Sequence, residues 1–222
     1  TKGKAFILFT SYTMLNQIYY SVVNKLKNSN FEIFLHGEKP RSQLIKEFKE
    51  AKNPVLFGTT SFWEGVDVQG ENLSNVIITK LPFLVPTDPI VSAISKKIEE
   101  SGGNSFSDFQ LPEAIIKFKQ GVGRLIRKKT DRGNVFILDS RIIKKRYGSA
   151  FIKALPSQKN IKILEKFEVL NSEILANLVE LVIRETIYLL RRLKGDKYEE
   201  YTENNNNNAD IYYINYYSRN VF

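Results

Sequence analysis

Two arginines near the middle of the chain have a type and spacing suited to phosphoryl chemistry. The segment at residues 120–127 reads Gln-Gly-Val-Gly-Arg-Leu-Ile-Arg and ends a stretch of helical periodicity. Arg124 and Arg127 are three residues apart, so on a helix they project from one side. Two guanidinium groups can grip a triphosphate and spread the charge of a phosphoryl-transfer transition state. Gln120, one turn before Arg124, is placed to orient the attacked phosphate or a water molecule.

The same segment has two other interpretations. Together with Lys128 and Lys129 it could be the solvated basic face of a helix, which needs no ligand. A dinucleotide-binding loop is the weaker alternative, because the two glycines follow a helical pattern rather than a strand, and Ile126 stands where a third glycine is required. The chain contains neither a G-x-x-x-x-G-K-[ST] phosphate loop nor a D-E-x-H element for Mg²⁺.

A second polar cluster follows an apolar run. Residues 58–70 read Gly-Thr-Thr-Ser-Phe-Trp-Glu-Gly-Val-Asp-Val-Gln-Gly. Hydroxyls and free amides at the end of a strand suit the phosphate oxygens of a nucleotide or a nucleic acid. Glu64 and Asp67 could accept from a ribose hydroxyl or couple to the arginines. Trp63 could stack on a base or pack under the loop, and Thr-Thr-Ser also suits an ordinary turn.

The first 156 residues alternate short apolar runs with helical patterns, which supply a scaffold for these groups. The expected strands are 4–9, 31–35, 54–57, 75–79 and 134–138, and the expected helices are 13–27, 41–50, 88–100 and 111–119. This order predicts an α/β fold with a mostly parallel central sheet and helices on its faces. Ligand groups gather at the carboxyl ends of such strands. The polar segments 10–12, 36–37, 58–67 and 139–141 fall at those ends.

Composition narrows the function classes. The net charge of +9 arises from 33 basic and 24 acidic residues, and residues 157–222 hold 9 basic and 10 acidic ones, so the excess lies in 1–156. A basic body suggests phosphate-bearing partners, although solubility alone also explains it. The chain has no cysteine and a single histidine, His36. Disulfides, thiolate metal sites and histidine-based metal sites within the chain are therefore excluded.

The pattern changes after Pro156. Apolar residues at spacings of three and four over 159–194 predict one or two amphipathic helices that end at Gly195. Residues 196–222 are low in complexity, and their asparagine run at 204–208 is not expected to build a core. The segment 211–217 is aromatic enough to dock as a strand or to promote aggregation. We therefore predict a body over 1–156, a helical extension over 157–195 and a tail over 196–222.

Taken together, these segments resemble the C-terminal, RecA-like motor domain of superfamily 2 helicases of the DinG/XPD group. Residues 120–127 resemble helicase motif VI, 59–70 resemble motif V in its DinG form, and 10–12 after an apolar strand resemble motif IV. Order and spacing match over about residues 3–170, with further support from the segments 80–83, 138–141 and 146–156. The chain starts with Thr1 and then a strand-like run, so we expect a piece of a longer polypeptide.

The resemblance implies a role for each motif. Arg124 and Arg127, with Gln120 beside them, would contact ATP phosphates held on the N-terminal motor lobe of the same polypeptide. The residues expected to face the nucleotide are Glu64, Gly65, Asp67 and Gly123. The residues expected to contact the DNA strand are Thr10, Ser11, Tyr12, His36, Thr59, Thr60, Ser61 and Trp63. For His36 a purely structural role is the alternative.

The resemblance also implies cofactors and partners. ATP and Mg²⁺ would be held mainly by the other lobe, and any iron–sulfur cluster would lie outside this chain. Single-stranded or forked DNA is the expected partner, with no membrane, in a bacterial-type cytosol at the nucleoid. The chain alone is expected to hydrolyse ATP negligibly. The alternatives are a non-catalytic nucleic-acid-binding module, a translocase that does not unwind, and an ordinary nucleotide-binding or metabolic domain.

Overall fold

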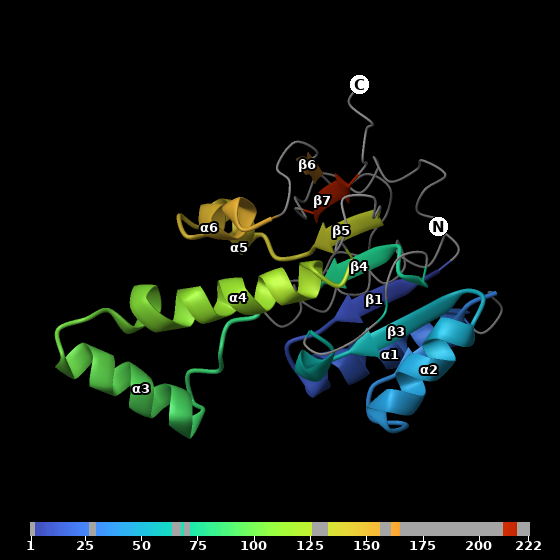
Figure 1. The fold of residues 1–222 in the computed structure, drawn as a ribbon, viewed down its shortest axis with the longest axis horizontal. Helices are drawn as coiled ribbons and strands as arrows, with labels where there is room; N and C mark the ends of the chain where they lie inside the picture. Colours follow the sequence, from blue (N-terminus) through green and yellow to red (C-terminus); the bar gives the residue numbers. More distant parts are fainter. Residues whose placement is uncertain are drawn as a thin grey trace, which may run out of the picture.

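A central sheet with helices on both faces forms the body of the protein (Figure 1). The computed structural model describes residues 3–26, 30–63, 68, 72–125, 133–155, 161–164 and 211–216. Its strands are β1 (Ala5–Leu8), β2 (Glu32–Leu35), β3 (Pro54–Gly58), β4 (Asn75–Ile78), β5 (Gly133–Ile137), β6 (Ile161–Leu164) and β7 (Ile211–Tyr216). Its helices are α1 (Tyr12–Leu26), α2 (Arg41–Glu50), η1 (Thr60–Phe62), α3 (Pro89–Glu100), η3 (Phe106–Gln110), α4 (Leu111–Val122), α5 (Arg141–Lys144) and α6 (Gly148–Lys153).

The first five strands run parallel, as the sequence predicts. The strand order is β2-β3-β1-β4-β5-β7-β6, with β1 between β3 and β4. Within β1, Ala5 pairs with Val55 on one side and with Asn75 on the other. All four residues of β1 are buried because both faces of the sheet are covered. This burial explains why the strands read as continuous apolar runs rather than alternating ones.

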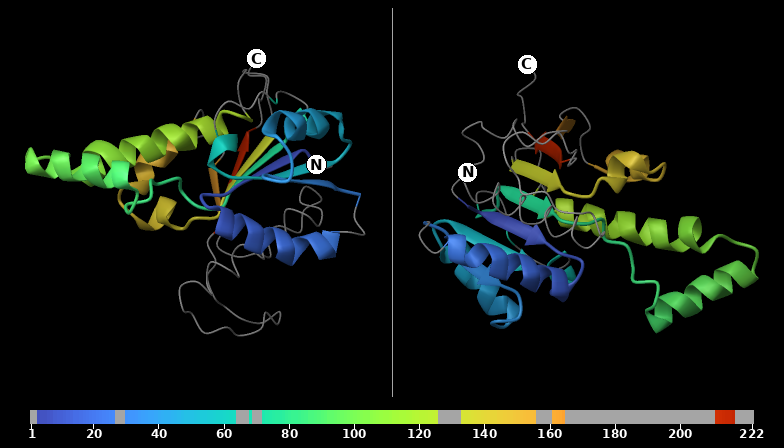
Figure 2. Two further views of the ribbon diagram at one scale, coloured as in Figure 1. Left: turned by 90° about the horizontal axis from the view of Figure 1, so that it is seen from below. Right: turned by 180° about the vertical axis from the view of Figure 1, so that it is seen from behind.

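Successive side chains of β1 enter two different cores. Ile7 packs in the core that Leu15 and neighbouring apolar residues of α1 complete. Phe6 lies in the opposite core, with Phe48 of α2 and Phe118 of α4. Figure 2 shows α1 on one side of the sheet and α2 on the other. The period of two along a strand therefore produces three layers, which confirms the predicted α/β class.

The C-terminal part differs from the expectation of a helix over 159–194. Residues 161–164 form strand β6, which pairs antiparallel with β7, and β7 in turn pairs antiparallel with β5. The sequence Ile-Lys-Ile-Leu suits a strand because β-branched side chains fit a pleated surface. Of the two alternatives left open for 211–217, docking as a strand is the one that β7 shows, over Ile211–Tyr216. The other residues of the predicted extension and tail lie outside the described residues.

Helices α3 and α4 form an arm that projects beyond the carboxyl edge of the sheet (Figure 1). Phe83, after β4, stacks on Phe106 of η3 at a centroid distance of 5.9 Å and meets Tyr147 and Phe151 edge-on. This aromatic group joins the arm to the body. Helix α4 returns to the sheet, so that a Cβ atom placed on Gly121 would lie 3.4 Å from Cδ1 of Leu8, the last residue of β1.

Candidate nucleic-acid and nucleotide interface

The carboxyl ends of β1, β2 and β3 bring four predicted site residues into one hydrogen-bonded group. The phenolic oxygen of Tyr12 lies 3.1 Å from Nδ1 and 3.0 Å from Nε2 of His36. Oγ1 of Thr59 lies 2.8 Å from Nδ1, and Oγ of Ser61 lies 3.3 Å from Nε2. We call Tyr12, His36, Thr59 and Ser61 the His36 cluster. The expectation that strand-end groups gather at one edge is confirmed for these residues.

The hydrogen bonds of the His36 cluster favour a neutral imidazole. The backbone N–H of Thr59 points at Nδ1 of His36 from 3.4 Å, and an N–H group can only donate. Nδ1 must therefore accept, which places the ring proton on Nε2. Burial lowers the pKa of His36 below its ordinary value of 6.5, and the nearby positive charge of Arg41 lowers it further. His36 therefore contributes hydrogen-bonding groups rather than a charge at neutral pH.

The buried ring of Phe62 packs against the His36 cluster. Phe62 is fully buried and meets the ring of His36 edge-on at a centroid distance of 4.7 Å. The guanidinium of Arg41 lies 5.6 Å from the centroid of the same Phe62 ring. Gly58 permits this arrangement because a Cβ there would lie 2.9 Å from Cβ of Phe62. The imidazole and a cation are thus held beside each other at the edge of the sheet.

Two helices begin at this edge without acidic residues in their first turns. Ser11 caps α1, since its Oγ accepts from the N–H of Met14 at 3.3 Å. Helix α2 begins at Arg41 and has no side-chain cap. Helix N-termini carry partial positive charge and favour anions. Ser11 and Tyr12 are exposed and Thr10 is partly buried, so this segment presents polar groups to solvent.

Two residues predicted to contact nucleic acid are buried instead. Trp63 has no exposed surface, and its Nε1–H donates to the carbonyl oxygen of Phe9 at 3.4 Å. The sequence left two roles open for Trp63, stacking on a base or packing under the loop. The buried indole packs under the loop and is not placed to stack on a base. Thr59 is only 3% exposed, so its hydroxyl acts on His36 rather than directly on a ligand. Thr60 lies in η1, and its side chain lies outside the described residues.

The tryptophan joins the loop after β3 to helix α4. A Cβ atom on Gly121 would lie 2.7 Å from Cε3 and 3.0 Å from Cζ3 of Trp63, so only glycine allows this approach. The first glycine of the Q-G-V-G-R segment is therefore required for packing against the indole. Gly123 follows α4 in a turn, where its N–H donates to the carbonyl of Lys119 at 2.8 Å.

Arg124 is fixed to the same loop. Its Nε donates to the carbonyl oxygen of Trp63 at 3.1 Å, and the residue is partly buried. One turn earlier, Oε1 of Gln120 is buried and makes no hydrogen bond within the described part of the chain. A buried amide oxygen usually has a partner, so this atom is suited to a ligand or a water molecule. The predicted site residues Glu64, Gly65, Asp67 and Arg127 lie outside the described residues.

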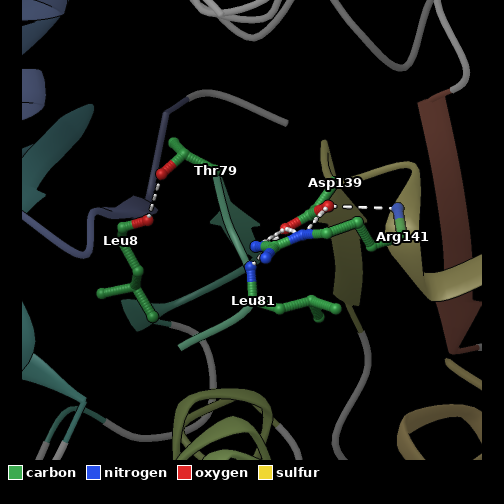
Figure 3. A network of polar contacts seen from close by, with 5 residues as sticks. All are labelled: Leu8, Thr79, Leu81, Asp139 and Arg141. Carbon is green, nitrogen blue, oxygen red and sulfur yellow. Dashed lines mark hydrogen bonds and ion pairs between the residues drawn. The ribbon is translucent and has the colours of Figure 1, made fainter. Parts of the chain in front are cut away.

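Sequence reasoning noted Asp139 and Arg141 at a strand end but assigned them no role. Asp139 is 7% exposed and accepts from Arg141, whose NH2 group lies 2.6 Å from its Oδ2, and from the N–H of Leu81 at 2.9 Å (Figure 3). Burial alone would raise the pKa of Asp139, but the hydrogen bonds from Arg141 and Leu81 outweigh it, and the pKa lies below its ordinary value. Arg141 also covers the ring of Phe83 at 5.3 Å.

The hydrogen bond from the N–H of Leu81 to Asp139 links the loop after β4 to the loop after β5. Nearby, the hydroxyl of Thr79 donates to the carbonyl of Leu8 at 2.9 Å, which ties the end of β4 to the end of β1 (Figure 3). Sequence spacing does not predict that the carboxylate of Asp139, after β5, accepts from the backbone N–H of Leu81, after the neighbouring strand β4. The only available signal was the position of Asp139 at a predicted strand end.

The donor types at this edge suit phosphate groups better than a metal ion. Within the described ranges, no group of three or more histidine, aspartate or glutamate side chains is placed to hold a cation. The guanidinium of Arg124 fits the oxygens of a nucleotide, whereas the buried Oε1 of Gln120 can accept only from a donor such as a water molecule. That Mg²⁺ is held by another lobe remains a prediction. Among the described residues, no helix is long and apolar enough to cross a membrane.

Five adjacent parallel strands, helices on both faces of the sheet and polar loops at its carboxyl edge define the RecA-like α/β class. The chain belongs to the helicase C-terminal domain family, whose model matches residues 1–158. Together with the relatives described next, this match confirms the resemblance to DinG-type helicases.

Two of the relatives described here carry helicase names, and a third carries an exonuclease name. The chain is 45% identical over 165 residues to the ATP-dependent DNA helicase YoaA of Haemophilus influenzae. The aligned residues make up 74% of this chain and 25% of that protein. The chain is 43% identical over 159 residues to the ATP-dependent DNA helicase DinG of Photobacterium profundum, covering 70% and 23%. The 3'-5' exonuclease DinG of Bacillus subtilis is 38% identical over 156 residues, covering 69% and 17%. The chain thus spans a quarter or less of the length of these relatives.

Proposed function

We propose that this chain is the C-terminal motor lobe of an ATP-dependent DNA helicase, which couples ATP hydrolysis to movement along DNA and to unwinding. The observation that carries the proposal is that the loop after β3 contacts both the His36 cluster and Arg124. Thr59 and Ser61 belong to the His36 cluster, and the carbonyl of Trp63, two residues further on, accepts from Arg124. A shift of this loop would therefore move the strand-binding groups and the arginine together.

In the proposed mechanism, the chain supplies the second half of a nucleotide pocket. ATP with Mg²⁺, bound on an N-terminal lobe, supplies the phosphoryl chemistry. Arg124 contributes a positive charge toward the phosphate oxygens, with Arg127 expected beside it. Gln120 offers its buried Oε1 to a water molecule. Its Nε is held by the Trp63 carbonyl, so the guanidinium is oriented before a ligand arrives. Loss of the phosphate contact after hydrolysis would let the two lobes part.

The His36 cluster and the N-terminus of α1 would hold the DNA strand during this cycle. Hydroxyls and a helix N-terminus contact phosphates without reading sequence. Binding is therefore expected to tolerate many sequences and to weaken as salt is raised. The cytosol at the nucleoid is the location that this function requires.

The proposal is tested by ATPase and strand-binding assays of the chain alone and together with a lobe that supplies the phosphate loop. The chain alone should hydrolyse ATP negligibly, and the combination should be stimulated by single-stranded DNA. Arg124→Ala should lower kcat by roughly 10³-fold or more, as loss of an arginine finger does, and leave strand binding nearly unchanged. Arg146→Ala is the matched control, because Arg146 is exposed between α5 and α6.

Two results would contradict the proposal. Robust hydrolysis by the isolated chain would show that a second lobe is not needed. Loss of strand binding in Arg124→Ala, with no effect on ATP hydrolysis, would instead favour a nucleic-acid-binding module that uses no ATP.

A further inference from the structure

One member of the His36 cluster is an exposed aromatic side chain. Tyr12 is the first residue of α1 and is 51% exposed. Its ring centroid lies 5.1 Å from that of His36, with the ring planes 36° apart. A half-exposed tyrosine ring offers aromatic surface that a flat ligand can cover. The buried Trp63 cannot serve as a stacking surface at this edge, whereas Tyr12 is accessible.

The tyrosine is held in place before any ligand binds. Its hydroxyl lies within 3.1 Å of both ring nitrogens of His36. His36 in turn is fixed by the hydroxyl of Thr59 at 2.8 Å and by the edge of the Phe62 ring. The phenol is therefore restrained at its hydroxyl and beside its ring by His36, which Thr59 and Phe62 in turn hold in place. A restrained ring loses little conformational entropy when a flat ligand stacks on it.

We propose that Tyr12 is a stacking surface for an unpaired nucleobase, and that His36 is the residue that positions it. This inference rests on the proposed strand-binding function and adds a contact to the base itself. Bases in a duplex are already stacked on their neighbours, so only a single strand can offer a free base face. Every base has such a face, and the contact therefore adds affinity for single strands without sequence preference.

The surroundings of Tyr12 suit the backbone next to a stacked base. The first turn of α1 contains no acidic residue, and Ser11 is exposed beside it. Arg41, close enough to lower the pKa of His36, adds positive potential at the same edge. A phosphate one nucleotide away from the stacked base would thus meet a helix N-terminus and the positive field of Arg41, whereas the nearby carboxylate of Glu38 acts on Tyr19 of α1.

The experiment compares two oligonucleotides of equal length, one of thymidines and one with the same backbone but abasic sites. Binding of each to the chain is measured by fluorescence anisotropy at fixed salt. Tyr12→Ala should weaken binding of the thymidine strand by roughly 5- to 150-fold, the range for loss of one stacked base, and leave the abasic strand nearly unchanged. Tyr20→Ala is the matched control, because Tyr20 lies on the same helix and is 66% exposed.

Variants of the positioning residue give a second readout. His36→Ala should reduce the preference for the thymidine strand over the abasic one, while His36→Asn, which keeps a donor and an acceptor, should restore part of it. Tyr12→Phe should keep more of the preference than Tyr12→Ala because the ring remains. Thermal unfolding of each variant is measured in parallel, and Tyr12→Ala should retain the wild-type Tm since the side chain is exposed.

The outcomes separate the stacking contact from the proposed function. If Tyr12→Ala weakens the thymidine and abasic strands equally, Tyr12 contacts only the backbone and the stacking proposal is overturned, while strand binding by this edge stands. An effect of Tyr20→Ala as large as that of Tyr12→Ala would also overturn it. If the wild-type chain binds neither strand, both the stacking contact and the strand-binding function are refuted.

Discussion

The Nε of Arg124 donates a hydrogen bond to the carbonyl oxygen of Trp63 at 3.1 Å. The bond joins the segment that resembles motif VI to the loop that resembles motif V, 61 residues earlier in the chain. It restrains the guanidinium at its Nε. The position of Arg124 therefore depends on the conformation of the loop after β3.

Gly121→Ala should separate this loop from helix α4. The added Cβ would lie 2.7 Å from Cε3 of Trp63, closer than packed atoms tolerate. Overpacking of this kind costs about 1–3 kcal/mol of unfolding free energy, measured by urea denaturation. We also expect a lower ATPase rate in the two-lobe protein, since Arg124 is fixed to the displaced loop.

The double variant Gly121→Ala/Trp63→Phe is the control for that mechanism. The smaller phenylalanine ring leaves space for the new methyl group, so the two substitutions should together cost less than the sum of their separate effects. Strict additivity of the unfolding free energies would show that the methyl group does not act through Trp63.

Trp63→Ala should behave as a core substitution. The side chain is fully buried, so its removal is expected to cost about 3–5 kcal/mol of unfolding free energy. Trp63→Phe should cost less and should leave the ratio of affinities for thymidine and abasic strands unchanged. A stable Trp63→Ala variant that had lost only its base-dependent strand binding would contradict the packing role.

Much of the fold can be predicted from the local pattern of apolar residues. The exceptions depend on contacts between residues far apart in the sequence. The five parallel strands and their helices were predictable because burial on both faces imposes uninterrupted apolar runs, as in β1. Strand β6 was not, because Ile163 also belongs to the spacing of three and four that predicted a helix over 159–194. Pairing with β7, about fifty residues later, decides between the two. A local pattern contains no information about that pairing.

The candidate site shows the same division. The sequence placed Tyr12, His36 and Ser61 at one edge because the carboxyl ends of parallel strands coincide. It could not decide whether Trp63 points outward, since this depends on the space that Gly121 leaves on α4. The contact between Asp139 and the N–H of Leu81 likewise joins two loops 58 residues apart.

Asp139→Asn should destabilise the carboxyl edge. It removes the charge that faces Arg141 and weakens the bond to Leu81, at a cost of about 1.5–3 kcal/mol, with the lower end favoured because Arg141 is 40% exposed. The pKa of Asp139 is lowered in the folded state, so its stabilisation is complete above its ordinary value of 3.8 and is lost as the pH falls through the folded pKa. Acid unfolding of the variant should therefore lose part of its pH dependence below pH 3.8. Glu100→Gln, an exposed substitution, should leave both stability and pH dependence unchanged.

His36 offers an unambiguous titration because it is the single histidine of the chain. Its ring proton resonance in NMR should titrate with a midpoint below 6.5, and Arg41→Gln should move the midpoint upward by removing a nearby positive charge. Because the folded pKa is lowered, the stability that His36 contributes is complete above about pH 6.5 and falls as the pH decreases below it. A midpoint above 6.5 would contradict the neutral imidazole on which the His36 cluster depends.

The most direct test of the two-lobe account is the effect of nucleotide on the affinity of this chain for a lobe that carries the phosphate loop. The dissociation constant is measured by calorimetry with and without a non-hydrolysable ATP analogue and Mg²⁺. We predict tighter association in the presence of the analogue, and loss of that gain in Arg124→Ala but not in Arg146→Ala. Association that does not depend on nucleotide, or a nucleotide effect that persists in Arg124→Ala, would contradict the claim that Arg124 completes a pocket on another lobe.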